Sequence, residues 1–445
     1  MTGRGVHLRD GFRTRLWPIP TLCVLWGLGL GLLLPWVDRL IGDGESDLIF
    51  GGGADAARTV LDTIAGSLIT VTSLTFSLTV VTLQLASSQF SPRLLRTFTR
   101  DLVVQTTLGL FLGTFAYALT VLRSVRTATG GEEPFVPSVS VTVAYLLAAV
   151  SVLALVFFLA HLTRTIRVES LLRGVHQEAS RLVERESGGD RITATDALAM
   201  VPAGALRVVA TTSGFLCGVA ERELVGVARE HDSVVLFERQ PGDSVVAGTP
   251  LGWVWRTDGG PWDDAAREDL VTRAIATVTT GFERTGTSDV ALGLRQLTDV
   301  AVKALSPGIN DPTTAAHALG HSSALLCQLS LVPLGPRLLR DDDGTIRAVV
   351  AWPSLADLVA IAVEQPAHYG REDPLIMSRL FTLLRELAWT DGAHSTAPIT
   401  AQLARLRRLV AATDLDPIDR QLLEAEAARV DDALAGRWER TGREH

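Results

Sequence analysis

The residues best suited to chemistry lie in one short stretch, Lys303–Ala315 (KALSPGINDPTTA). Lys303 is the only lysine in the chain, so any reaction that needs a lysine amine must use it or be absent. Asp311 followed by Pro312 is typical of a helix start, with an N-cap residue and a proline at the first helical position. Such a start presents free backbone N–H groups, which are well suited to binding anions and phosphates.

Six side chains of this stretch are therefore candidates for binding a small ion or an anionic ligand. They are Lys303, Ser306, Asn310, Asp311, Thr313 and Thr314. The alternative is a helix–loop–helix corner whose polar groups are satisfied internally. Upstream, Arg295 and Asp299 precede Lys303 at intervals of four residues and could form an ion-pair ladder along one helix face.

Neighbouring motifs do not complete a metal or nucleotide site. His317 and His321 have the i, i+4 spacing of a metal-binding pair, but the glutamate of a His-Glu-x-x-His motif is missing. Ala304 follows Lys303, so the chain has no Gly-Lys-Ser/Thr phosphate-binding loop. The segment Asp341–Gly344 lacks the alternating ligands of a calcium loop and is expected to form a hairpin turn. We therefore expect no metal site and no cofactor.

Composition excludes further classes of function. The three cysteines, Cys23, Cys217 and Cys327, have no paired spacing, which excludes a disulfide framework and a Cys-rich zinc site. The net charge of −8 is spread along the chain without a basic block, so nucleic acid is not an expected partner. No nucleophile–base pair is recognisable, and we expect that the protein is not an enzyme.

The candidate residues must be positioned by a chain that is partly embedded in a membrane. Four segments are long, apolar and free of formal charge: Trp17–Trp36, Thr63–Pro92, Leu102–Leu122 and Phe135–Ala160. Each is long enough for a helix to cross the lipid bilayer, which needs about 20 residues. Arginines gather before the first span, between the second and third, and after the fourth. The positive-inside rule therefore predicts a multi-pass protein of the cell membrane with both termini in the cytoplasm.

Two of the expected spans carry small or polar residues with a regular spacing. In the third, Gly109 and Gly113 would let a neighbouring helix approach closely. In the second, polar side chains form two stripes at about 100° per residue. One stripe holds Thr72, Thr75, Thr79, Thr82 and Gln89; the other holds Thr70, Ser73, Ser77, Gln84 and Ser88.

Two interpretations of these stripes are open. The hydroxyls could bond to their own backbone and hold neighbouring helices together. Alternatively, one stripe could face a water-filled path in an oligomer. No ionisable residue lies within Thr63–Pro92, which argues against a proton relay through this span.

The loop expected between the first two spans, Val37–Asp62, is rich in acidic residues and glycine. Its acidic residues include Asp43, Glu45, Asp47 and Asp55. Either it forms an electrostatic vestibule for cations, or it is an ordinary solvated loop.

Four domains are expected: a four-span membrane domain (1–162), a stalk helix and linker (163–204), a small β-rich module (205–257) and a mainly helical domain (258–445). Short β-branched runs between turn residues predict the strands of the module. Its phrase Pro241–Leu251 resembles the small barrels of biotinyl- and lipoyl-carrier proteins, although the module has no lysine to carry a prosthetic group. The predicted fold class is four transmembrane helices plus a cytoplasmic α+β domain, with a β-sandwich or barrel-like module and a helical remainder.

Three passages together resemble one family, the bacterial predicted membrane proteins designated domain of unknown function 2254. They are Ser87–Phe98 (SSQFSPRLLRTF), Lys303–Ala315 and His368–Pro374 (HYGREDP). With the layout of the spans, the resemblance covers most of the chain. The resemblance implies a membrane topology. The family has no established activity that could be assigned to this chain.

Function must therefore be inferred from the physical pattern. We expect a homo-oligomeric channel or pore-like protein, with the second span near the axis and the cytoplasmic domain in a regulatory role. The alternative is a membrane-anchored scaffold or sensor without transport activity, whose cytoplasmic domain binds a ligand or protein near Lys303–Thr314.

Overall fold

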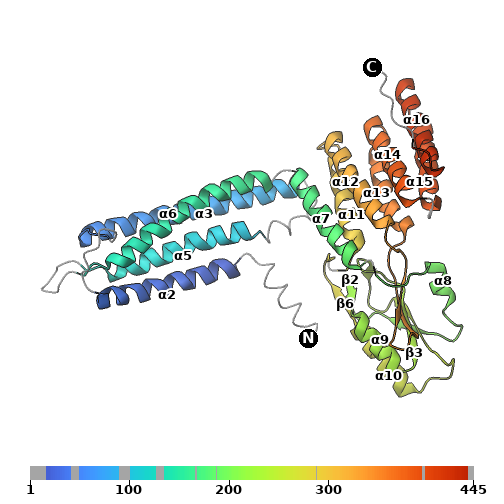
Figure 1. The fold of residues 1–445 in the computed structure, drawn as a ribbon, viewed down its shortest axis with the longest axis horizontal. Helices are drawn as coiled ribbons and strands as arrows, with labels where there is room; N and C mark the ends of the chain where they lie inside the picture. Colours follow the sequence, from blue (N-terminus) through green and yellow to red (C-terminus); the bar gives the residue numbers. More distant parts are fainter. Residues whose placement is uncertain are drawn as a thin grey trace. The chain divides into compact units, whose positions relative to one another are not determined.

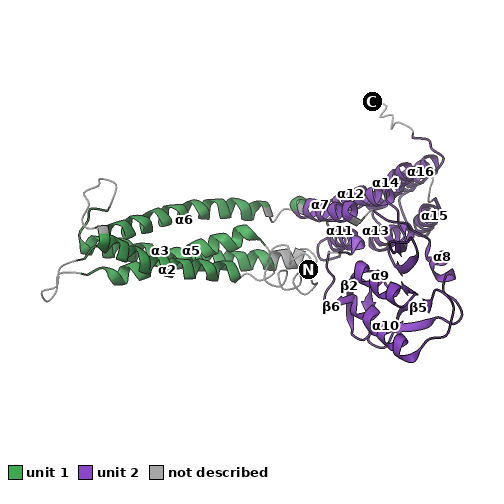
Figure 2. Cartoon of the chain, turned by 60° about the horizontal axis from the view of Figure 1, so that its bottom comes forward, with its two compact units in different colours: residues 1–170 green, residues 171–445 purple. Residues whose placement is uncertain are grey.

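The computed structural model describes residues 17–41, 50–89, 101–126, 135–165, 168–186, 188–286, 288–392 and 396–438. The chain divides into two compact units, Met1–Ser170 and Leu171–His445 (Figure 2). Long helices build the first unit, whereas the second combines two β-sheets with a stack of helices (Figure 1).

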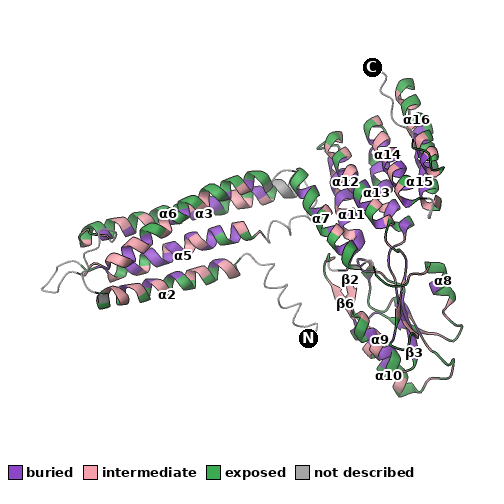
Figure 3. Ribbon diagram, viewed as in Figure 1, coloured by how far each residue is buried: buried purple, intermediate pink, exposed green. Residues whose placement is uncertain are grey.

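The first unit contains four helices that are long and apolar enough to cross a membrane. They are α2 (Pro18–Ile41), α3 (Ala54–Gln89), α5 (Leu102–Ser124) and α6 (Ser138–Thr165). The four spans predicted from the sequence are thus present as helices among the described residues. Of the residues in the apolar 18-residue window of each helix, 56% are buried in α5, 28% in α3 and 17% in both α2 and α6. The helix at the centre of the bundle is therefore α5, flanked by the other three (Figure 3).

Close approach of α2 and α5 depends on glycine. A Cβ atom added at Gly113 would lie 2.8 Å from the carbonyl oxygen of Cys23, and one added at Gly109 would lie 2.9 Å from its sulfur. On the other helix, a Cβ at Gly27 would overlap the carbonyl oxygen of Gly113. The close packing expected from the Gly109–Gly113 spacing is confirmed.

The second span begins earlier than predicted. Helix α3 starts at Ala54, whereas the sequence favoured a loop up to Asp62. Ala57 and Leu61 are fully buried in a cluster with Tyr117 of α5, which stabilises this polar first part of the helix. The loop prediction was wrong here because it followed the charged residues and could not include the distant apolar partners.

Polar side chains fix the helix ends of the bundle. The carboxylate of Asp38 on α2 accepts hydrogen bonds from the backbone N–H groups of Val139 (2.9 Å) and Ser140 (3.1 Å) at the start of α6. At the other end of α6, His161 lies 2.6 Å from the carboxylate of Asp101, which also caps α5. These contacts satisfy helix-terminal groups that would otherwise lack partners.

Eight strands form two open sheets among the described residues of the second unit. The larger has the order β1 (Leu206–Val209), β5 (Pro250–Arg256), β3 (Ser233–Phe237), β8 (Ile346–Val350) and β7 (Arg337–Arg340). The smaller has the order β4 (Ser244–Val245), β2 (Gly214–Val219) and β6 (Val278–Gly281). All pairings are antiparallel except the parallel pair β3–β8.

Neither sheet closes on itself, so the expected β-sandwich or barrel is not observed. The sheets also extend beyond the segment 205–257, because β6, β7 and β8 follow it in the sequence. The parallel pairing of Val235 in β3 with Ala348 in β8 joins distant parts of the chain. A local strand–turn pattern cannot reveal such a pairing.

Both faces of the larger sheet are covered. Val235 and Phe237 of β3 pack in one cluster with residues of α9 (Glu221–Glu230) and α10 (Asp264–Ala276). Leu236 points to the other face and packs with Ala197 of α8 (Ala194–Ala199). All five residues of β3 are buried, as expected for a strand with helices on both sides.

The remaining helices are α7 (Val168–Glu186), α11 (Val290–Ala304), α12 (Pro312–Ser330), α13 (Leu355–Tyr369), α14 (Pro374–Asp391), α15 (Thr396–Ala412) and α16 (Pro417–Leu434). In the second unit α7 packs on α11, where a Cβ at Gly293 would overlap the side chain of Ala179. Asp416 caps α16, which begins at Pro417.

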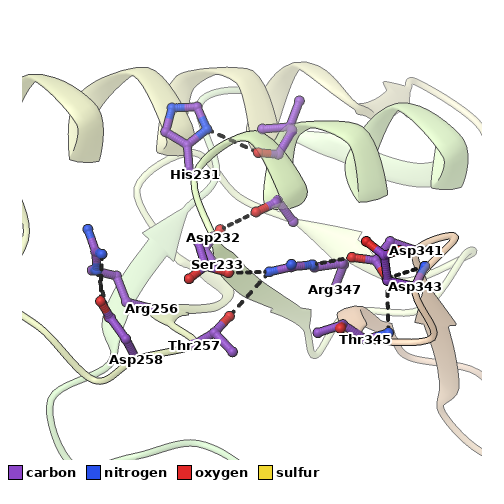
Figure 4. A network of polar contacts seen from close by, with 12 residues as sticks. His231, Asp232, Ser233, Arg256, Thr257, Asp258, Asp341, Asp343, Thr345 and Arg347 are labelled. Carbon is purple, nitrogen blue, oxygen red and sulfur yellow. Dashed lines mark hydrogen bonds and ion pairs between the residues drawn. The ribbon is translucent and has the colours of Figure 1, made fainter.

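A turn between β7 and β8 carries the network drawn in Figure 4. Asp341 accepts hydrogen bonds from the backbone N–H groups of Asp343 (3.1 Å) and Thr345 (2.9 Å), and its other oxygen lies 2.7 Å from Arg347. This contact with Arg347 lowers the pKa of Asp341, and Arg347 also reaches Asp232 at 2.8 Å. The segment Asp341–Gly344 is therefore a hairpin turn, as predicted.

Candidate functional site

The corner between α11 and α12 contains the six ligand-binding candidates of the sequence. Helix α11 ends at Ala304, and Asp311 caps α12 by accepting a hydrogen bond from the backbone N–H of Thr314 at 3.0 Å. Hydrogen bonding by the Thr314 side chain and N–H lowers the pKa of Asp311. The predicted helix end, N-cap and first-turn proline are confirmed at this corner.

Most polar groups of the corner bond within it. The hydroxyl of Ser306 donates to the carbonyl oxygen of Lys303 at 2.6 Å. The backbone N–H groups of Asn310 and Asp311 donate to Ser306 and Ala304, each at 2.9 Å. Asn310 has φ = 50°, a left-handed conformation that asparagine tolerates better than most residues. Three of the candidates therefore stabilise the corner by hydrogen bonds within it: Ser306, Asp311 and Thr314.

Lys303, Asn310 and Thr313 offer the side chains still available to a ligand. Within the described part of the chain, none of these three side chains has a hydrogen-bond or ion-pair partner, and Asn310 and Thr313 are exposed. Lys303 therefore takes no part in the expected ion-pair ladder. An anion at the start of α12 would meet the carboxylate of Asp311, which already accepts a hydrogen bond from the N–H of Thr314. An anion at this corner would therefore have to bind through the side chains of Lys303, Asn310 and Thr313.

The two histidines of α12 have different surroundings. His317 is exposed, whereas the ring of His321 lies 5.8 Å from that of His176 on α7. Burial, followed by the positive neighbours His176 and Arg173, lowers the pKa of His321. No group of three or more potential metal ligands occurs among the residues that the structure describes. The contact with His176 had no signal in the sequence, because it joins helices that are distant along the chain.

On α3, the first predicted stripe faces the interior of the bundle. Thr72, Thr75 and Thr82 are buried and Thr79 is half-buried. The hydroxyls of Thr72 and Thr82 donate to the backbone carbonyls one turn earlier, at 2.6 and 2.8 Å. This stripe therefore packs within one chain, as the helix-packing interpretation expected. Gln89 and Ser88 lie outside the residues whose side chains are described.

The second predicted stripe lies on the surface of the first unit. Thr70, Ser73, Ser77 and Gln84 are all exposed. Because α3 begins at Ala54, four further residues continue the same line at 100° per residue. We call the whole set the outward stripe: Asp55, Thr59, Asp62, Gly66, Thr70, Ser73, Ser77 and Gln84. All eight are exposed, and on a helical wheel they fall within an arc of about 80°.

Other exposed surfaces of the bundle are apolar. Those of α2 and α6 carry large hydrophobic side chains: Leu22, Leu25, Trp26, Leu32, Leu33 and Trp36, and Leu146, Val150, Val152, Leu153, Val156 and Phe157. Exposed Ile69 and Phe76 on one side, and Leu74 and Val81 on the other, flank the outward stripe of α3. The first unit therefore has apolar surfaces suited to lipid and one polar line with apolar borders.

Comparison with known proteins agrees with the architecture. The model of the family described as predicted membrane protein (DUF2254) matches residues 13–386. An uncharacterised protein of Mycobacterium bovis is 34% identical over 440 residues, which cover 98% of this chain and 83% of the relative. An uncharacterised protein of Mycobacterium tuberculosis shows the same identity and coverage. No solved structure matches the chain. The chain therefore belongs to the DUF2254 family of predicted membrane proteins.

Proposed function

We propose that the protein is a homo-oligomeric channel of the cell membrane, whose copies surround a water-filled path lined by the outward stripe of α3. The observation that carries this proposal is the exposure of a polar line on a helix of membrane-spanning length. Ser73, Ser77 and Gln84 have no hydrogen-bond partner among the described residues. Lipid chains offer none, and an unpaired amide or hydroxyl in an apolar medium costs about 2–7 kcal/mol.

The apolar borders of the stripe support association between copies. Phe76 on one side and Leu74 on the other are exposed next to the polar line. Neighbouring copies can pack through these borders, and the polar residues between them then face the centre of the assembly. The first predicted stripe, which includes Thr75, is already buried within one chain and is not needed for this contact.

Arginine distribution supports the orientation. In the sequence, arginines cluster before the start of α2, between α3 and α5, and after or at the end of α6, for example Arg164. The positive-inside rule supports a cytoplasmic location for these segments, and with them for both termini and the second unit. In this proposal, the second unit has a regulatory role.

Reconstitution in planar bilayers tests the channel. We expect conductance above that of the empty membrane, and we expect its loss when Ser73→Leu and Ser77→Leu are combined. Ser67→Leu is the matched control, because Ser67 is an exposed serine of α3 outside the stripe. Absence of conductance for every ion, or equal conductance in the double variant, would overturn the proposal.

A second candidate function is a ligand-binding sensor without transport. The available side chains of Lys303, Asn310 and Thr313 at one corner favour it. Calorimetric titration with inorganic phosphate would show binding that Lys303→Ala abolishes and that Arg371→Ala, at an exposed arginine of another loop, leaves intact. Equal binding by both variants would count against this candidate.

A further inference from the structure

We propose that the path selects cations, and that Asp55 and Asp62 of the outward stripe set this selectivity. This inference rests on the proposed channel and names the class of ion that it carries. Its basis is the early start of α3, which places two carboxylates on the same line as the membrane-spanning hydroxyls. Rings of aspartate at the mouth of a pore attract cations and repel anions.

Both carboxylates are available to ions. Asp55 and Asp62 are exposed, and within the described ranges neither carboxylate has a hydrogen-bond or ion-pair partner. They lie seven residues apart, two helical turns, on the same face of α3. In an assembly with the outward stripe at its centre, each residue would form one ring.

Three described charged side chains near this end of the bundle, Arg58, Asp38 and Arg39, are engaged elsewhere. Arg58 lies between the two aspartates in sequence, but its guanidinium donates to the carbonyl oxygen of Val125 at 3.1 Å. The carboxylate of Asp38 is held by the start of α6, and Arg39 lies 5.0 Å from the ring of Phe135. No described basic side chain therefore has a contact with the two aspartates of the stripe.

Two threonine hydroxyls of the stripe, those of Thr59 and Thr70, provide a second indication of cations. The hydroxyl of Thr59 donates its hydrogen to the carbonyl oxygen of Asp55 at 2.8 Å, and that of Thr70 donates to Gly66 at 3.0 Å. A hydroxyl has one hydrogen and two lone pairs, so these groups retain only acceptor capacity. Oxygen lone pairs coordinate cations such as Na⁺, K⁺ and Ca²⁺, whereas an anion requires donors.

The test measures the reversal potential of the reconstituted full-length protein in a KCl gradient. For the wild type, we expect the reversal potential to be shifted from zero toward the equilibrium potential of potassium. The combined substitutions Asp55→Asn and Asp62→Asn should lower the preference for potassium over chloride by about tenfold, equivalent to about 1.4 kcal/mol of lost attraction. Glu169→Gln removes one negative charge outside the stripe and should leave the preference unchanged.

The outcomes separate this inference from the channel itself. Conductance that favours chloride, or an unchanged potassium preference in the double aspartate variant, would overturn the cation assignment while the channel stands. No conductance in the wild type would overturn the channel, and the cation assignment with it. Size-exclusion chromatography of the double variant in detergent, with elution as for the wild type, shows that any change in selectivity does not come from loss of assembly.

Discussion

Asp311 has a structural role as the residue that caps the start of α12. Its carboxylate accepts a hydrogen bond from the N–H of Thr314 in the first turn of α12, while its own N–H donates to the carbonyl oxygen of Ala304. At the other end of the chain, Asp416 begins α16 in the same way, through the N–H of Ile418. In both cases a proline follows the cap, so a short sequence signal is sufficient to locate the helix start.

Substitution of Asp311 tests this role. Asp311→Ala should lower the free energy of unfolding by about 1 kcal/mol, because one backbone N–H of α12 loses its partner. Asp311→Asn should retain most of the stability, since an amide oxygen can also accept that hydrogen bond. The measurement is the denaturation midpoint of the full chain in detergent. An equal loss in the two variants would show that charge, and not capping, matters here.

His321 predicts a dependence of stability on pH. Its pKa is lower in the folded protein than the ordinary value of about 6.5, so the unfolded chain takes up the proton first as pH falls. The contribution of His321 to the free energy of unfolding is thus complete above about pH 6.5. It is lost as the pH falls through the pKa of the folded state.

The corresponding experiment compares melting temperatures at about pH 8 and about pH 5.5, on either side of the ordinary pKa of histidine. The wild type should lose stability on acidification, and His321→Gln should lose less of it. His368→Gln, at an exposed histidine of α13, should behave as the wild type. Identical pH profiles for all three proteins would contradict the role assigned to His321.

At the level of elements, sequence patterns located features whose causes are local. The four spans follow from long uncharged runs, and the corner at Asp311 follows from cap and proline. The early start of α3 and the pairing of β3 with β8 depend on partners distant in the chain, such as Tyr117 and Ala348. For the same reason, the sequence predicted one half of the outward stripe and missed Asp55 and Asp62, which it assigned to a loop.

The contact of α2 with α5 gives a prediction with a built-in control. Gly27→Ala should lower the melting temperature in detergent, because its Cβ would overlap the carbonyl oxygen of Gly113 and such overpacking costs about 1–3 kcal/mol. Gly29→Ala, on the same helix, meets no neighbouring atom and should be neutral or slightly stabilising. Equal effects of the two substitutions would mean that α2 does not pack on α5 in this way.

For the whole molecule, the proposed channel requires assembly of several copies. One chain buries its first threonine stripe and exposes a second polar line between apolar borders. The mass of one chain is 47.7 kDa. We therefore expect particles in detergent or nanodiscs whose mass, after correction for bound lipid, corresponds to two or more chains. A monomer at every protein concentration would exclude a path formed between copies.

The most direct test asks whether the outward stripe meets water at membrane depth. Ser73→Cys and, as a control on the apolar surface of α6, Leu153→Cys are made after replacement of Cys23, Cys217 and Cys327 by alanine. A thiol reacts as its thiolate, which forms in water and not in lipid. A water-soluble thiosulfonate reagent should label Ser73→Cys in intact membranes and leave Leu153→Cys unmodified. Absence of labelling at Ser73→Cys would contradict the account.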